Sequence, residues 1–383
     1  MDNLQLFSTI ILAISLGYFF LYLYMLSHEE PHKSELKEFP VVTILVALRN
    51  EQENILACCQ ALNNLDYPPD KTEILMLNDK SEDNSRNLIA DFIKDKPQFH
   101  LMDIKEDLNG LSGKINALAQ AIKKTSAEFI FVTDADCQPH PGWIKTLLSY
   151  YDDKTAMISG FTIMDKIKPG LIDKLQKIDM IYLQSMAYMS SNINRPLTML
   201  GNNMTFRRSV YNMVGGFEAI GFTVNEDHDL MKAILQKTNY RPRYICDKDG
   251  PVTSLPMAGF ARFIKQRLRW TVGGLNARPF AYFLVGLSFI VHSAMAILMF
   301  VGPWNTTSGT AIGLVLGIDY FLLKRSIRSL KLSTTPWQFL IYEVFYIIYT
   351  HILILLLPFS RRVKWKGRKY IREQNGLVKE SQK

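Results

Sequence analysis

The sequence lacks the glycine-rich patterns that cradle phosphates in many nucleotide-binding folds. Neither G-x-G-x-x-G nor G-x-x-x-x-G-K-[ST] occurs in its 383 residues, which argues against a dinucleotide-binding fingerprint and a P-loop. If the chain binds a nucleotide, its phosphates must be held by a metal ion and by side chains instead. Internal repeats and low-complexity segments are also missing.

Cysteine is scarce and is not arranged to bind zinc. The four cysteines are Cys58, Cys59, Cys137 and Cys246, and no two of them form a C-x-x-C pair. Adjacent cysteines make an awkward disulfide, so we expect all four to be reduced thiols.

Positive charge does not indicate nucleic-acid binding here, although the net charge is +8. Ser360–Lys383 holds nine Lys or Arg residues against two Glu residues, so this tail alone carries +7. The remainder is close to neutral. A basic tail after an apolar segment is typical of contact with anionic lipid, so we expect membrane lipids as partners and no nucleic acid.

Apolar segments lie at both ends of the chain. Leu4–Leu26 contains no charged residue and would form a helix about 34 Å long, enough to cross a bilayer. A cleaved signal peptide is disfavoured because Met1–Gln5 has no Lys or Arg and no small-x-small cleavage site follows. Further apolar stretches are Phe280–Val301, Thr310–Leu323 and Trp337–Leu357.

These stretches divide the chain into four parts. We expect a transmembrane anchor at 1–30, a soluble domain at 38–278, membrane segments at 279–358 and a basic cytosolic tail at 359–383. The uncharged N-terminus, against Lys33 and Lys37 after the first segment, places the soluble domain in the cytoplasm of a multi-pass protein of the cell (inner or plasma) membrane.

The basic residues of the C-terminal region conflict with three further crossings. Both Lys324–Arg328 and the tail are basic, and the positive-inside rule puts each of them in the cytoplasm. One segment must therefore not span. Trp337–Leu357 is the first candidate because polar residues recur along it near helical spacing. The short Thr310–Leu323 stretch, with Asp319, is the other.

The soluble part alternates short apolar strands with helical patterns. Predicted strands are 41–47, 73–77, 99–102 and 128–133, and predicted helices between them are 53–62, 82–93 and 113–123. This alternation is typical of an α/β fold with a mostly parallel sheet. Ligands of such sheets bind beyond the carboxyl ends of the strands, where the chain presents Arg49, Asn50 and Glu51, then Asp79, then Asp134 and Asp136.

Two carboxylates follow the last of these strands directly. Asp134 and Asp136 are two residues apart in an extended segment, so both side chains can face one divalent cation. Asp227/Asp229 and Asp247/Asp249 have the same spacing, so only the position after a buried strand distinguishes the first pair. Asp134 could equally cap the following turn.

A set of motifs from Val41 to Gly274 resembles glycosyltransferase family 2, in order and in spacing. The motifs are Val46–Glu51, Asn78–Ser85, Gly113-Lys114, Asp134-Ala135-Asp136, Asn225-Glu226-Asp227 and Gln266–Trp270. The last is the Q-x-x-R-W element of membrane-embedded members such as cellulose, hyaluronan and ceramide glucosyl-transferring enzymes. The tail segment Trp365–Tyr370 also looks like the W-x-G-R-x-Y ending of ceramide glucosyltransferase-like enzymes.

The resemblance implies a GT-A fold, which is Rossmann-like, and a nucleotide-sugar donor, expected to be a UDP-sugar. It implies Mg²⁺ or Mn²⁺ on Asp136, assisted by Asp134. It assigns the donor to Ala47, Arg49, Glu51, Asp79, Lys114 and Asp134. Asp227, with Glu226, would be catalytic, and Asp227 would act as the general base toward an acceptor hydroxyl. The paired acids expected after the second strand are here Asn78-Asp79, so the role of Asn78 stays open.

Two of these assignments have competing structural interpretations. Asn225, Glu226 and Asp227 could simply cap the helix that follows, and Lys114 could be a solvated helix lysine. In the 266–270 element, helical spacing puts Arg267 with the apolar residues and Gln266, Arg269 and Trp270 on the other face. Arg269 is thus the expected diphosphate clamp, Trp270 the expected acceptor platform, and the helix is expected to lie on the membrane.

We therefore expect an inverting, metal-dependent glycosyltransferase that moves a sugar to a lipid-linked or saccharide acceptor at the cytoplasmic membrane face. A processive polysaccharide synthase is the alternative, although extrusion needs a protein-lined path. A non-catalytic membrane scaffold and a transporter built around Asp319, Glu343 and His351 are more remote.

Overall fold

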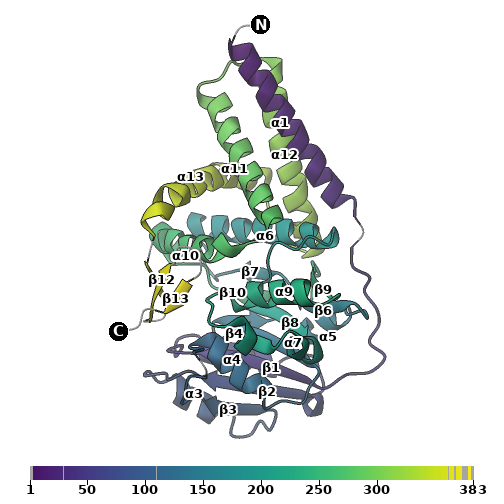
Figure 1. Cartoon of the computed structure of the whole chain (residues 1–383), viewed down its shortest axis with the longest axis vertical. Coiled ribbons are helices and arrows are strands. Elements are labelled where there is room, and N and C mark those ends of the chain that lie inside the picture. The colour runs from purple at the N-terminus through teal and green to yellow at the C-terminus, as the bar shows by residue number, and fades with distance from the viewer. Residues whose placement is uncertain are drawn as a thin grey trace.

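The computed structural model describes residues 3–28, 30–108, 110–360, 362–365, 368–372 and 378–380. Figure 1 shows an elongated molecule with a sheet-containing part at one end and long helices at the other. The chain starts at the far tip of the long helices, crosses to the sheet part, and returns to the helices after residue 278.

A seven-stranded sheet forms the centre of the sheet-containing part, in the order β3-β2-β1-β4-β8-β6-β9. The predicted strands are present as β1 (Val42–Leu48), β2 (Thr72–Asn78), β3 (Phe99–Asp103) and β4 (Phe129–Asp134). They pair in parallel. Helices α2 (Ile55–Asn63), α3 (Ser85–Phe92) and α4 (Lys114–Ile122) connect them. Parallel strands that are buried on both faces are connected by such crossover helices. The parallel strands and the helices between them confirm the predicted α/β fold.

The second half of the sheet was not predicted. Strand β8 (Asn203–Arg207) pairs antiparallel with β4 and with β6 (Thr155–Ser159), which pairs in parallel with β9 (Arg241–Tyr244). A small second sheet joins β5 (Cys137–Pro139), β10 (Val252–Ser254) and β7 (Thr162–Met164). These strands are three to five residues long, too short for periodicity to reveal them.

Several helices complete the sheet-containing part. They are α5 (Trp143–Leu148), α6 (Leu171–Asn192), α7 (Arg208–Met213), α8 (Gly216–Ile220), α9 (Glu226–Lys237) and α10 (Gly259–Gly273), with short 3₁₀ turns at Pro69–Lys71 and Gly274–Asn276. Helices α6 and α10 lie between the sheet and the long helices in Figure 1. Most residues of α6 are buried because α6 packs against both parts.

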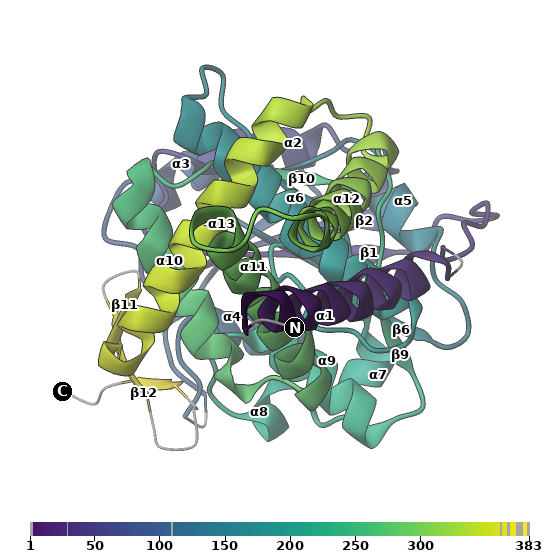
Figure 2. The same cartoon turned by 90° about the horizontal axis from the view of Figure 1, so that it is seen from above.

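Four described helices are long and apolar enough to cross a membrane: α1 (Asn3–Leu26), α11 (Pro279–Phe300), α12 (Thr306–Ser329) and α13 (Pro336–Leu356), the last continued by a 3₁₀ turn to Phe359. Helices α1, α11 and α12 run together, away from the sheet (Figure 1). Helix α13 lies across them, and it appears nearly full length when the molecule is seen from above (Figure 2).

Helix α12 is longer than the predicted 310–323 stretch and includes the basic residues up to Arg328. After α13 the tail forms β11 (Arg362–Trp365), β12 (Arg368–Arg372) and β13 (Val378–Glu380). The W-x-G-R-x-Y pattern falls partly outside the described residues.

Candidate active site

The polar residues predicted at the strand ends meet at one edge of the sheet. Ala47 of β1 pairs with Asp134 of β4, and the backbone N–H of Asp79 donates to the Leu48 carbonyl at 2.9 Å. Asn50 and Lys80 both have positive φ, 54° and 58°, a conformation that turns the chain sharply and that Asn tolerates better than most residues. Both turns therefore follow directly on strands that end at this edge.

The other strand-end residues surround this edge. The Arg49 guanidinium forms an ion pair with the exposed Glu82, with Nη2 at 3.3 Å from Oε1. The buried Nε of Arg49 has no hydrogen-bond partner in the described part of the chain. Glu51 is buried and accepts a hydrogen bond from Asn54 Nδ2 at 3.0 Å. Asn78, whose role was open, donates to Asp103 of β3 at 2.8 Å, so it holds two strand ends together.

Lys114 joins two acidic residues that are far apart in sequence. Its Nζ lies 2.6 Å from Asp134 Oδ1 and 2.8 Å from Glu226 Oε1, and it donates to the Gly201 carbonyl at 3.3 Å. Burial alone would lower the pKa of Lys114, but the two carboxylates raise it well above its ordinary value. Lys114 is therefore a largely buried cation at the start of α4, with 12% of its side chain exposed, and not a solvated helix lysine.

Asp227 lies beside this cluster. Its Oδ2 accepts from the Gly201 N–H at 2.6 Å and its Oδ1 from the His228 N–H at 2.7 Å. A Cβ on Gly201 would come within 3.0 Å of Glu226 Oε1 and 3.2 Å of Asp227 Oδ2, so the absence of a side chain permits this approach. Burial, and next the neighbouring Glu226, raise the pKa of Asp227 to about 7, although Lys114 and the two N–H groups oppose the shift.

The capping interpretation of this segment receives only partial support. Helix α9 does begin at Glu226, but the Asn225 side chain makes no capping hydrogen bond. One oxygen of Asp227 bonds within its own turn, while the other reaches the separate loop at Gly201.

Asp134 and Asp136 flank the same two buried thiols. Cys58 Sγ lies 3.7 Å from the Asp134 carbonyl, and Cys137 Sγ lies 3.6 Å from Asp136 Oδ1. Burial raises the pKa of both thiols, and both carboxylates raise it further. The two acids are thus close to each other at the end of β4, and their carboxylate oxygens are the ligands that Mg²⁺ and Mn²⁺ prefer.

Helix α10 ends against the start of α9. A Cβ on Gly273 would come within 2.1 Å of Asn225 Nδ2, and Lys232 Nζ of α9 donates to the Asn276 carbonyl at 2.9 Å. The predicted acceptor and diphosphate residues Gln266, Arg269 and Trp270 are all half-buried in the turns just before this contact. The structure thus brings the C-terminal end of α10 and the turn after it to the start of α9.

Arg267 is buried, in agreement with its predicted position among the apolar residues of α10. Its guanidinium forms an ion pair with Asp179 of α6, with Nε at 2.9 Å from Oδ2. It also lies 4.3 Å from the Trp270 ring centre, so one side of that ring is covered. Sequence reasoning missed Asp179, since nothing near it in the sequence marks a buried acid.

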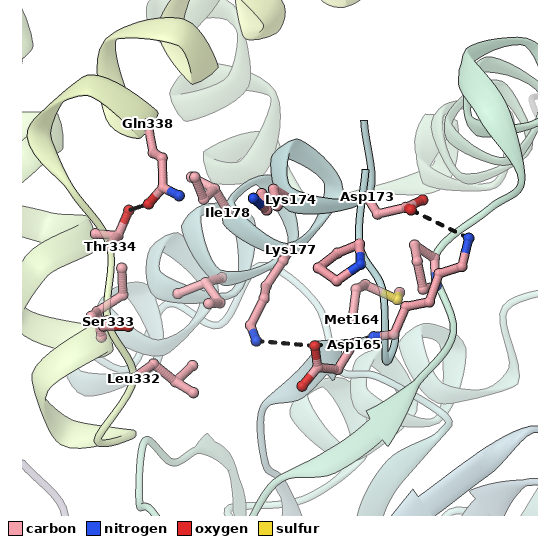
Figure 3. A pocket seen from close by; sticks show the side chains of 15 residues that line it. Met164, Asp165, Asp173, Lys174, Lys177, Ile178, Leu332, Ser333, Thr334 and Gln338 are labelled. Atoms are coloured by element: carbon pink, nitrogen blue, oxygen red, sulfur yellow. Dashed lines mark hydrogen bonds and ion pairs between the residues drawn. The ribbon is translucent and has the colours of Figure 1, made fainter. Parts of the chain in front are cut away.

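A cavity of about 180 Å³ lies elsewhere, between α6 and the segment that joins α12 to α13 (Figure 3). Its lysines are partly neutralised, because Lys177 pairs with Asp165 at 3.3 Å and Lys166 with Asp173 at 3.4 Å. None of the residues predicted to bind donor, metal or acceptor lines it. The strand-end cluster remains the candidate site, since it is where the acidic residues converge.

Comparison with known proteins identifies the family. The family model described as Glycosyl transferase family 21 matches residues 7–378. A probable glycosyltransferase of Bacillus subtilis, YdaM, is 24% identical over 89% of this chain and 87% of its own length. A poly-beta-1,6-N-acetyl-D-glucosamine synthase of Staphylococcus epidermidis is 26% identical over 71% of this chain and 65% of its own.

A beta-monoglucosyldiacylglycerol synthase of Trichormus variabilis is 25% identical over 61% of this chain, which spans about half (49%) of that relative. Among solved structures, the mannosyltransferase PcManGT of Pyrobaculum calidifontis, in complex with GDP-Man and Mn²⁺, superposes with a TM-score of 0.57 at 18% identity. The superposed region covers 90% of this chain and 98% of the PcManGT chain. This likeness supports the expected GT-A-like fold.

The expected membership of family 2 stays a prediction, since the matching model is that of family 21. That model covers nearly the whole sequence, including the apolar helices at both ends. The chain therefore belongs to glycosyl transferase family 21 and is a glycosyltransferase.

Proposed function

We propose that this protein is an inverting, metal-dependent glycosyltransferase that moves a sugar from a nucleotide-sugar, a UDP-sugar in the first instance, to a lipid-linked hydroxyl at the cytoplasmic membrane face. The observation that supports this most strongly is the cluster around Lys114, which brings Asp134, Glu226 and the Gly201 loop that holds Asp227 to one place. A donor diphosphate and an acceptor hydroxyl need to meet between such groups.

Asp227 is suited to the general base. A base works best when its pKa lies near the operating pH, and burial raises that of Asp227 to about 7. The Gly201 and His228 N–H groups fix the orientation of its carboxylate. Direct attack by the activated hydroxyl on the anomeric carbon, from the side opposite the diphosphate, would invert the configuration there.

The leaving diphosphate needs positive charge. Lys114 supplies one buried cation beside Asp134, and Arg269 would supply another from α10. Asp136 and Asp134 would hold Mg²⁺ or Mn²⁺, which when bound neutralises charge on the departing phosphates as a Lewis acid. Arg49, Glu51 and Asp79 would bind the nucleoside at the ends of β1 and β2, alongside the backbone at Ala47.

A lipid-linked acceptor is supported by the position of the site. Helix α10, which carries Gln266 and Trp270, lies between the sheet and the apolar helices (Figure 1). Its neighbour α13 exposes apolar side chains over its whole length, such as Trp337, Val344 and Leu355. A relative that is named a beta-monoglucosyldiacylglycerol synthase fits an acceptor drawn from the bilayer.

We further propose that α1, α11 and α12 span the membrane and that α13 does not. Each of the three helices has one end near the sheet part (Figure 1): α1 and α12 have their C-terminal ends there, at Leu26 and Ser329, and α11 has its N-terminal end there, at Pro279. With α13 lying across them, Lys324–Arg328 and the basic tail fall on the same side as the soluble domain. The conflict with the positive-inside rule then disappears, and the domain lies in the cytoplasm.

A processive polysaccharide synthase is the second candidate, because relatives include poly-beta-1,6-N-acetyl-D-glucosamine synthases. Extrusion needs a path through the bilayer. Helices α1, α11 and α12 contact one another directly, so a polymer passing through this bundle would have to separate them. Single transfer to a membrane lipid needs no such path.

The test is a donor screen with full-length protein in lipid nanodiscs. Release of nucleoside diphosphate is measured for UDP- and GDP-sugars with Mn²⁺ or Mg²⁺, and products are identified by mass spectrometry. We expect transfer of single sugars to lipid, loss of activity with a chelator, and loss in Asp136→Asn. Long polymer would favour the synthase. Inactivity of the wild type with every donor and lipid extract would sink the proposal.

A further inference from the structure

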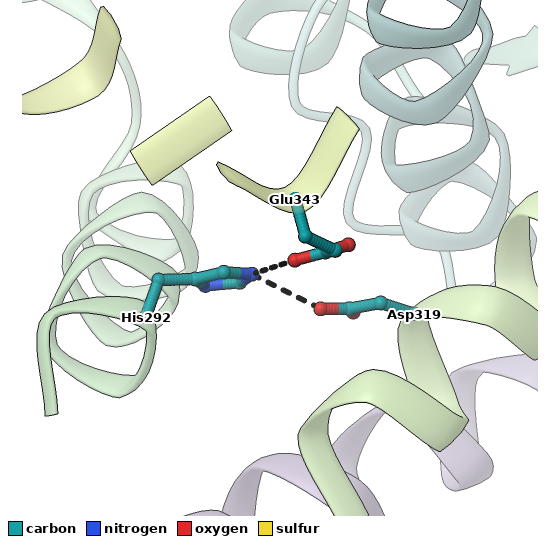
Figure 4. A group of neighbouring side chains, drawn as sticks. All are labelled: His292, Asp319 and Glu343. Carbon is teal, nitrogen blue, oxygen red and sulfur yellow. Dashed lines mark ion pairs between the residues drawn. The ribbon is translucent and has the colours of Figure 1, made fainter. Parts of the chain in front are cut away.

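One histidine and two acidic residues form a buried group among the apolar helices. His292 of α11, Asp319 of α12 and Glu343 of α13 each place a ligand atom within 4.8 Å of the others. His292 Nε2 lies 3.1 Å from Asp319 Oδ2 and 3.4 Å from Glu343 Oε2, as Figure 4 shows. The exposed fractions of the three side chains are 1%, 0% and 4%. The glycosyl transfer proposed above uses none of them.

The hydrogen bond made by the His292 ring shows which of its two nitrogens carries the proton and which faces the acidic residues without one. His292 Nδ1 lies 2.7 Å from the Ser288 carbonyl oxygen, and because a carbonyl only accepts, Nδ1 carries the proton. A neutral ring then turns the lone pair of Nε2 toward two carboxylates. Apart from the two contacts with Nε2 given above, Nε2, Asp319 Oδ2 and both oxygens of Glu343 have no hydrogen-bond partner in the described part of the chain.

Such a group needs positive charge at its centre. Lone pairs that face one another in a dry, low-dielectric interior repel strongly. A second proton on His292 would neutralise only one of the two carboxylates, so one acid would also have to keep its proton, and no Lys or Arg of the described residues pairs with Asp319 or Glu343. A divalent cation with a neutral imidazole and two carboxylates leaves no net charge to bury.

The distances agree with a coordination shell. Ligands bound at about 2.1 Å are separated by about 3.0 Å at right angles and about 3.4 Å in a tetrahedron. The two distances from Nε2 are 3.1 and 3.4 Å. Outer partners are also in place, because Tyr18 of α1 donates to Asp319 Oδ1 at 2.7 Å and His292 Nδ1 donates to the Ser288 carbonyl. Metal-binding His and Asp side chains typically have such partners.

We propose that His292, Asp319 and Glu343 bind a structural divalent transition-metal ion, with Zn²⁺ the best match because imidazole disfavours Mg²⁺ and Ca²⁺. The ion links α13 to α11 and α12 at one point. It thereby fixes the helix that lies across the bundle and that also contacts α6 and α10. The site is distinct from Asp134 and Asp136 and is independent of the proposed reaction.

The first experiment measures metal retained by the full-length protein, purified in detergent without added metal, by plasma mass spectrometry. An Asp136→Asn background removes the proposed catalytic ion. We expect stoichiometric zinc in the wild type and in Asp136→Asn, and at least about a tenfold loss when Glu343→Gln is added. His351→Gln is the matched control, because His351 is also on α13 but bonds to Ser293 Oγ at 3.1 Å. It should retain the zinc.

A second measurement tests the proposal on the wild type itself, and so does not depend on how well a variant folds. After chelation, added Zn²⁺ should raise the Tm of the wild type and of His351→Gln, since a ligand that binds only the folded state stabilises it. Glu343→Gln should not respond. A wild type that retains no metal and whose Tm ignores Zn²⁺ and Mn²⁺ would overturn the proposal and leave a protonated His292 between two acids. Full zinc retention in Glu343→Gln would overturn the ligand assignment.

Discussion

Single residues near the candidate site derive their properties from neighbours distant in sequence. Asp227 would titrate like an ordinary carboxylic acid in solution, near 4. Here Gly201 lets its carboxylate approach Glu226 and Lys114 closely, and burial with the adjacent negative charge disfavours the ionised form. A motif can mark Asp227, but only the folded loop gives it a pKa suited to a base.

Replacing Asp227 by Asn should lower kcat by about 10²–10⁴-fold, the usual contribution of a general base. Asn has the same size, and its amide oxygen can still accept one of the two N–H bonds that Gly201 and His228 now donate to separate oxygens, so we expect the fold to persist. Nucleoside diphosphate release and circular dichroism test the two statements. Asp229→Asn is the matched control, since Asp229 lies in the same turn and pairs only distantly with Lys232, at 3.9 Å. Equal losses in both variants would contradict the assignment.

The pH dependence of the reaction should report the same group. A base must be deprotonated, so the reactive form is populated above the pKa and is lost as the pH falls. With the pKa of Asp227 raised to about 7, kcat/KM should rise between pH 6 and 8 and level off above, by about tenfold per unit on the acid side. Initial rates across this range provide the measurement. A profile that is flat down to pH 5 would rule out Asp227 as the titrating base.

At the scale of elements, three helices are joined by one buried ion pair. Arg267 of α10 pairs with Asp179 of α6, and Tyr342 and Tyr349 of α13 donate to the other oxygen of Asp179 at 3.3 and 2.7 Å. Charges buried in this way stabilise a fold only as long as both partners are present. The contact therefore couples the helix of Gln266 and Trp270 to the helix that lies across the bundle.

Arg267→Met should lower the free energy of unfolding by about 3–5 kcal/mol, because Asp179 would remain buried without its partner. Arg262→Met, an exposed change on the same helix, should stay within about 0.5 kcal/mol. Thermal unfolding in detergent compares the two. Adding Asp179→Asn to Arg267→Met should recover part of the lost free energy of unfolding. A double variant that loses more than the two single variants together would contradict the pairing.

At the scale of the whole molecule, the orientation of α13 decides the topology. If α13 crossed the membrane, the segment before it and the tail after it would face opposite sides. If α13 lies across the bundle as in Figures 1 and 2, both face the same side as the sheet, which is the cytoplasm in the proposed topology.

Variants with one added cysteine, labelled with a membrane-impermeant maleimide in intact cells, test this topology. Thr306→Cys, at the outer start of α12, should be labelled. Thr334→Cys and Ser381→Cys, before and after α13, should react only after the cells are opened. All variants also carry Cys246→Ser, because Cys246 is only half-buried and could react, whereas the other three native cysteines are buried. Labelling of Ser381→Cys from outside would show that α13 spans.

Elements whose signal is local can be predicted from residues that are neighbours in the chain. Apolar stretches predicted the long helices, alternating strands and helices predicted the parallel half of the sheet, and the strand ends placed Asp79, Asp134 and Asp136 at one edge, because periodicity and burial follow from neighbours along the chain. Tertiary structure alone decided the rest. The short strands after Cys137, the pairing of Arg267 with Asp179, the bridge made by Lys114 and the meeting of His292 with Asp319 and Glu343 all join residues distant in sequence. Such contacts depend on how the elements pack, and no local pattern records them.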